Sequence, residues 1–405
     1  MRSLRGALLP LMAASVILSI SFGIRSSLGL AIPEMRLDLA WPTSTFALAF
    51  AIQNLLWGFA SPFAGALADR IGTFRTLALG AVIYTLGLVC MALASTPWML
   101  HGSAGLLVGL GFGTTGFPIV LGALARAVPE DRRSLALGLG AAGGSFGQFL
   151  MPPVFQAFIG GFGWQGALFI TAAMVVLLVP FGYLLGRRAA EPAETSDVAG
   201  SLREAFRNAR GHGGYRLLNV GFFVCGFHVA FVSVHLPVFA QVCGLAPSVA
   251  AQSLALIGLF NMIGTSIAGA LGDRFRKKWL LSAIYALRAV VILVFFLGPK
   301  TPTSFLVFSS VLGMLWLSTV PLTSGVVAQI FGTRYLASLF GVVMFSHQIG
   351  AFIGAYAGGL VFDLTGTYDL MWLSAAALGV FAAIVHAPID DVPLARRLTS
   401  APNPA

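Results

Sequence analysis

One arginine in this sequence stands where a positive charge is costly, inside a long apolar stretch near the N-terminus. Arg25 follows Ser21 by one helical turn. A guanidinium in hydrocarbon must pair with a carboxylate, backbone carbonyls, water or a bound anion. The central parts of the apolar stretches contain no Asp or Glu, and arginine binds carboxylates through paired hydrogen bonds. We therefore expect Arg25 to bind an anionic small molecule; the alternative is an outward pairing with Glu34 or Asp38.

Four further ionisable side chains fall within apolar stretches. His228 and His235 are seven residues apart, which places them on one helix face, and His347 lies in a later stretch. Because imidazole titrates near neutral pH, these histidines are candidates for carrying protons. The alternative is that neutral imidazoles form hydrogen bonds between helices. For Arg288 we expect a structural hydrogen-bonding role.

The sequence contains no pattern typical of a catalytic, metal or nucleotide site. Cys90, Cys225 and Cys243 are widely separated and form no Cys-x-x-Cys pair, so we expect them to pack as small apolar residues. There is no His-x-x-x-His pair or embedded carboxylate cluster, and the glycine run 109–113 is not followed by a P-loop lysine. We expect no cofactor, no metal and no enzymatic activity.

The elements that position these side chains must be membrane-spanning helices. Hydrophobic residues make up 58% of the 405 residues and charged residues only 9%, against about 25% in soluble domains. This composition excludes a soluble cytosolic enzyme and a disordered chain. It also excludes an outer-membrane barrel, whose strands alternate polar and apolar residues.

Twelve apolar stretches are long enough to cross a bilayer as helices. Their approximate ranges are 8–33, 44–68, 76–95, 99–125, 134–158, 164–187, 216–241, 248–272, 279–298, 303–329, 336–362 and 369–388. We therefore expect an all-α polytopic membrane protein. Its partner is the lipid bilayer, and we expect a monomer.

The net charge of +10 is explained by topology. With both termini inside, twenty of the 24 basic residues fall in inner segments and only Arg36 and Lys300 fall in outer loops. This is a strong positive-inside bias, so binding to nucleic acid is not needed to explain the charge. We expect a multi-pass protein of a bacterial inner (plasma) membrane, with cytoplasmic termini.

The chain contains an internal duplication. The hexamer at 65–70 (GALADR) recurs at 269–274 (GALGDR), 204 residues later, and three Pro or Gly pairs share an offset of 203. These pairs are Pro118 with Pro321, Gly138 with Gly341, and Gly147 with Gly350. We expect two six-helix bundles, 1–188 and 216–405, joined by a cytoplasmic linker at 189–215.

Each copy of the hexamer ends in an acidic and a basic residue on the inner side. The pairs are Asp69 with Arg70 and Asp273 with Arg274. We expect each acidic residue to meet a helix N-terminus or a basic partner across the inner surface, as a conformational latch. The alternative is a solvated turn.

Residues 65–72 (GALADRIG) resemble the signature loop of the major facilitator superfamily, through Gly65, Leu67, Asp69, Arg70 and Gly72. The second copy departs from the pattern where Arg276 replaces the last glycine. The resemblance covers all twelve spans and implies alternating access around a site at the membrane midplane. It also implies that spans 1, 4, 7 and 10 line the cavity.

A second resemblance is narrower. Residues 23–29 and 225–231, the latter followed by His235 and Pro237, are similar to bacterial relatives of the monocarboxylate transporters and the oxalate/formate exchanger group. Those transporters carry an Asp and an Arg one turn apart in span 8. Asn261 and Thr265 stand at the matching positions here, so the resemblance does not extend to that proton device.

These observations predict a secondary active transporter of a small organic anion, most simply a monocarboxylate, with protons as the candidate coupling ion. The predicted substrate-binding residues are Arg25, Asn54, Thr115, His228, Asn261, Trp316 and His347, and the coupling candidates are His228, His235 and His347. The alternatives are an exporter of amphipathic or drug-like compounds, and a sensor or assembly partner that transports nothing.

Overall fold

The structure is a computed structural model that describes residues 2–128, 133–187, 199–332 and 335–393. All regular elements in these ranges are helical. We call residues 2–187 the N-half and residues 213–393 the C-half. The N-half holds α1 Arg2–Ser27, η1 Leu28–Ala31, α2 Ile32–Leu39, α3 Thr43–Ile71, α4 Thr73–Ala92, α5 Pro97–Leu100, η2 His101–Leu107, α6 Val108–Thr115, α7 Phe117–Ala127, α8 Arg133–Val176 and α9 Leu178–Gly186.

The C-half has the same general make-up and follows the surface helix α10 Ala199–Gly211. Its helices are α11 Gly213–Val242, α12 Pro247–Arg274, α13 Lys277–Leu297, α14 Pro302–Leu315, α15 Thr319–Phe331, α16 Leu336–Thr365 and α17 Asp369–His386. The expected all-α polytopic fold is confirmed. Residues 188–198 of the predicted linker lie outside the described residues.

Eleven segments of the described chain are long and apolar enough to cross a membrane. One of them, Ala136–Gly186, contains two of the predicted spans. They are separated at Gly163, whose φ of 70° is a left-handed conformation that glycine adopts without strain. The twelve predicted spans are therefore all present.

Spans 4 and 10 are broken in the middle. Span 4 is interrupted at Gly116, between α6 and α7, and span 10 between α14 and α15, at residues 316–318. Pro118 and Pro321 follow the two breaks, and proline cannot donate the backbone hydrogen bond that would continue the preceding turn. Backbone groups freed inside a membrane must find other partners, so the breaks define places where side chains are needed.

The duplication is visible in the way each half is packed. In the N-half, α1 and α8 approach so closely that a Cβ on Gly147 would overlap the backbone carbonyl of Ser19. In the C-half, α11 and α16 make the same contact, with Gly350 against the carbonyl of Phe223. The facing glycines, Gly23 and Gly226, are likewise 203 residues apart. We call these two contacts the glycine seams.

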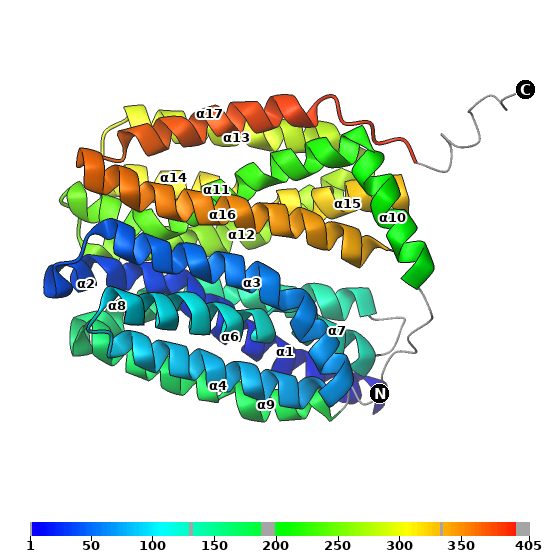
Figure 1. The fold of residues 1–405 in the computed structure, drawn as a ribbon, viewed down its shortest axis with the longest axis horizontal. Helices are drawn as coiled ribbons and strands as arrows, with labels where there is room; N and C mark the ends of the chain where they lie inside the picture. The colour runs from blue at the N-terminus through cyan, green and yellow to red at the C-terminus, as the bar shows by residue number, and fades with distance from the viewer. Residues whose placement is uncertain (1, 129–132, 188–198, 333–334, 394–405) are drawn as a thin grey trace, which may run out of the picture.

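The two halves lie side by side, with α3 of the N-half along α16 of the C-half (Figure 1). A second contact joins α8 to α12. The surface helix α10 and the start of α1 lie at one end of the bundle and α2 lies at the other. We call the α2 end the outer end, following the orientation predicted from the basic residues, and the α10 end the inner end.

Candidate functional site

The guanidinium of Arg25 lies between three helices of the N-half. Its Nη2 donates a hydrogen bond to Oδ1 of Asn54 on α3, and Nδ2 of Asn54 donates to the carbonyl of Phe50, at 2.8 Å. The guanidinium carbon lies 4.7 Å from the ring centroid of Trp57 and 5.2 Å from that of Phe112. Aromatic faces attract a cation, so Arg25 is held by one amide and two rings.

The positive charge of Arg25 is not neutralised by the protein. Among the described residues no carboxylate forms an ion pair with it, and its Nε has no hydrogen-bond partner. The alternative pairing with Glu34 or Asp38 is not formed between these described residues, and Oδ2 of Asp38 instead accepts a hydrogen bond from Nε1 of Trp164 at 2.8 Å. A half-buried charge paired only with neutral groups favours an anion that comes from outside the chain.

Arg25 faces a small cavity between the two halves. Gly29, Phe50, Gln53 and Asn54 of the N-half line it with Arg25, and Val229, Ala230, Ser233 and Val234 of α11 close it from the C-half. Its volume is about 20 Å³, which is room for about one water molecule. The two halves must therefore separate around Arg25 before a carboxylate could reach it.

Two predicted substrate-binding residues lie at the break in span 10: Trp316 is part of it, and Asn261 contacts it from α12. Oδ1 of Asn261 accepts a hydrogen bond from the backbone N–H of Leu317 at 3.0 Å. On the other side of the break, Nε of Arg288 donates to the carbonyl of Leu315 at 3.1 Å, and its Nη2 donates to the carbonyl of Trp316. The expected structural role of Arg288 fits this geometry, because it satisfies carbonyls that the break leaves free.

His347 lies in a second polar cluster, inside the C-half. Its side chain is buried, its ring lies 5.2 Å from that of Phe222, and it interacts with the thiol of Cys225. Nearby on α11, Sγ of Cys225 lies 3.4 Å from Oγ1 of Thr319 and close to the carbonyl of Trp316. This cluster is separate from the residues that line the Arg25 cavity.

His228 and His235 face helices of their own half. Nε2 of His228 lies 2.8 Å from the carbonyl of Ala375 on α17. Nε2 of His235 lies 2.7 Å from the carbonyl of Ala355 on α16, and its Nδ1 lies 3.1 Å from the hydroxyl of Tyr368. Both imidazoles therefore connect helices of the C-half, and the structure does not bring them together with Arg25.

Thr115 also lies away from the Arg25 cavity. Its hydroxyl donates to the carbonyl of Gly111 at 3.1 Å, within its own helix, and its methyl group packs towards Gly80 on α4. Of the seven predicted substrate-binding residues, the structure thus places only Arg25 and Asn54 at the same cavity. Trp57, which the prediction of the site did not include, lies three residues after Asn54 on α3 and contacts the guanidinium from the same side.

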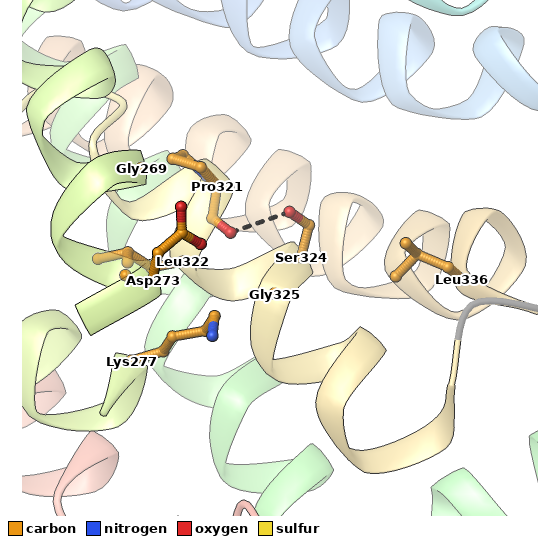
Figure 2. A pocket seen from close by; sticks show the side chains of 9 residues that line it. Gly269, Asp273, Lys277, Pro321, Leu322, Ser324, Gly325 and Leu336 are labelled. Carbon is orange, nitrogen blue, oxygen red and sulfur yellow. Dashed lines mark hydrogen bonds between the residues drawn. The ribbon is translucent and has the colours of Figure 1, made fainter. Parts of the chain in front are cut away.

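The second latch motif lies beside an open groove of about 370 Å³ at the inner end. Figure 2 shows Asp273 and Lys277 at this groove, next to the turn of α15 where Ser324 donates to the carbonyl of Pro321 at 3.1 Å. Arg70, Asp273 and Arg274 are exposed and form no ion pair with another described residue. The side chain of Asp69 lies outside what the structure describes.

Residues 14–355 and 262–403 match the family model described as Major Facilitator Superfamily. The chain is 27% identical to monocarboxylate transporter 13 of Bos taurus over 90% of its length and 86% of that protein. It is 30% identical to monocarboxylate transporter 11 of Homo sapiens over 92% of its length and 81% of that protein.

A solved structure has a similar fold. It is a bacterial homologue of the human lysosomal transporter Spinster, in an inward-facing and occupied conformation. The TM-score is 0.75 at 16% identity, with 98% of each chain covered.

Proposed function

Because this chain belongs to the major facilitator superfamily, whose members are transporters and not enzymes, we propose that it is a secondary active transporter of a small organic anion, most simply a monocarboxylate. The observation that carries the proposal is the un-neutralised guanidinium of Arg25 at the cavity between the halves. The similarity to monocarboxylate transporters supports the same substrate class.

The cycle that we propose is alternating access. When the halves separate around Arg25, the guanidinium and the amide of Asn54 bind the carboxylate, and Trp57 and Phe112 form the apolar side of the site. Bidentate geometry suits a carboxylate because two N–H groups of arginine point in parallel. The halves then close around the anion and open on the other side of the membrane.

For proton coupling we propose His347 among the three histidine candidates. Neither of its ring nitrogens is hydrogen-bonded to a backbone carbonyl of the described residues, whereas His228 and His235 each hold one. We propose a monomer in a bacterial inner membrane as the setting of this cycle, and the charge bias of the sequence supports cytoplasmic termini.

The test is uptake of labelled monocarboxylates of two to six carbons into proteoliposomes. We expect Arg25→Ala to abolish uptake, because the only cation among the described residues that line the cavity is lost, and Arg25→Lys to keep a part of it. Arg216→Ala, which removes an exposed arginine at the inner end of α11, is the matched control and should transport normally. Thermal unfolding of all three variants should match that of the parent protein.

Two outcomes would reject the proposal. The first is normal carboxylate uptake by a folded Arg25→Ala protein. The second is a parent protein that moves amphipathic cations or drug-like compounds and no carboxylate, which would favour the exporter.

A further inference from the structure

At the outer end, a carboxylate of the C-half caps a helix of the N-half. Oδ1 of Asp363, near the end of α16, accepts a hydrogen bond from the backbone N–H of Thr43 at 2.8 Å, and Oδ2 accepts one from Ser44 at 2.6 Å. These are the first two residues of α3, and the N-cap residue Pro42 offers no side-chain acceptor. The acceptor that the start of α3 requires is therefore supplied from 320 residues away.

The charge of Asp363 adds to this contact. The aligned peptide dipoles of a helix place partial positive charge at its N-terminus, and a carboxylate there is stabilising. Each carboxylate oxygen is matched with one N–H donor, so the geometry uses both oxygens. The contact exists only while α16 and the start of α3 are together.

The backbones around this carboxylate are in close contact. Gly359, one turn before Asp363, lies so near α3 that a Cβ there would overlap the side chain of Ala47 and come within 2.9 Å of Cα of Ser44. A third contact is made by Arg36 of α2, whose guanidinium carbon lies 5.1 Å from the ring centroid of Phe362. All three contacts join the two halves at the outer end.

The inner end is different, because the exposed Asp273 and Arg274 form no ion pair with another described residue there. We propose that Asp363 and Gly359 form an outer clasp that holds the outer end closed and must release before the outer end can open. This inference rests on the alternating-access cycle proposed above and is independent of the substrate.

The experiment measures the distance between the outer ends of the two halves by pulsed electron paramagnetic resonance. Spin labels are attached at Ser95→Cys in the N-half and Thr303→Cys in the C-half, both exposed residues. The native cysteines Cys90, Cys225 and Cys243 are replaced by serine. The full-length protein is measured in lipid nanodiscs without added solute, so that the result does not depend on transport.

We expect Asp363→Ala to raise the population with a long label distance, relative to the population with a short one, roughly fivefold to tenfold. This corresponds to the free energy typically lost with a helix cap. Gly359→Ala should act in the same direction through steric overlap. The controls are Asp369→Ala, an exposed acid at the start of α17, and Gly341→Ala on α16, where a Cβ meets nothing within 4 Å. Neither control should change the distances.

An unchanged distance distribution in a folded Asp363→Ala protein would overturn the clasp. If that variant does not fold, Gly359→Ala decides, and an unchanged distribution there overturns the proposal equally. If Asp363→Ala changes the distances but the parent protein takes up no carboxylate, the result would count against the proposed substrate only.

Discussion

At the scale of single residues, the site depends on an arginine whose partners are all neutral. Asn54 supplies one acceptor, and Trp57 and Phe112 supply aromatic faces. Hydrogen bonds and cation–π contacts lower the cost of burying the guanidinium without cancelling its charge. The charge therefore remains available to an anion, which a fixed carboxylate at the same place would prevent.

A substitution at Asn54 tests whether the charge of Arg25 binds the anion. We expect Asn54→Asp to abolish anion uptake while preserving or raising thermal stability, because the new carboxylate would pair with Arg25 and repel an incoming anion. Asn54→Ala, which removes the acceptor without adding charge, should keep measurable uptake. The measurement is uptake into proteoliposomes together with thermal unfolding in detergent. Normal transport by Asn54→Asp would show that Arg25 does not bind the anion.

At the scale of elements, the break in span 10 is held from two sides. Arg288 on α13 donates to the carbonyls that end α14, and Asn261 on α12 accepts from the N–H of Leu317 before α15 begins. Two polar residues at membrane depth thus satisfy backbone groups that the broken helix exposes. One of the two, Asn261, is also a predicted substrate-binding residue.

We therefore expect Arg288→Met to destabilise the protein by about 2–4 kcal/mol, because buried carbonyls lose their donor. Arg288→Lys should recover a part of the loss, since an ammonium can donate to one of the carbonyls. The measurement is thermal unfolding in detergent, with Leu287→Met on the exposed face of the same helix as the control. Wild-type stability in Arg288→Met would mean that the break does not need this residue.

The sequence predicts the helices well and the faces of the helices poorly. The length of the apolar stretches predicts the twelve spans. Gly163 interrupts the helix between two of them, in the gap that separates the predicted ranges 134–158 and 164–187. A spacing of seven places His228 and His235 on one face, but only packing decides that this face meets α16 and α17. Asp363 could not be predicted as a contact residue, because its partners are backbone N–H groups and leave no sequence signal.

At the scale of the whole molecule, the structure is closed at the outer end, where the outer clasp forms, and the described latch residues at the inner end are exposed. In a two-state cycle each set of contacts stabilises the conformation in which it forms. The outer clasp and the inner latches should therefore have opposite effects on the same equilibrium.

We expect Asp273→Asn, added to Asp363→Ala, to shift the outer-end distances back towards the short values of the parent protein. Asp273 is proposed to stabilise the state in which the inner end is closed, and sites far apart act additively. The distance assay described above measures this. Glu204→Gln on α10, another exposed acid at the inner end, is the control and should leave the double-label distances of Asp363→Ala unchanged. Identical results for Asp273→Asn and its control would argue against the latch.

The glycine seams lie wholly within one half or the other, between α1 and α8 and between α11 and α16. Neither of these two seams joins one half to the other, although Gly258 of the C-half also lies close to the backbone of Gln148 in the N-half. A protease that nicked the backbone ahead of α10 would therefore leave both close-packed interfaces intact, and the two fragments would still present complementary surfaces along α3 and α16. The covalent link between the halves then serves to keep them at a high local concentration. The packing within each half depends on its own seam.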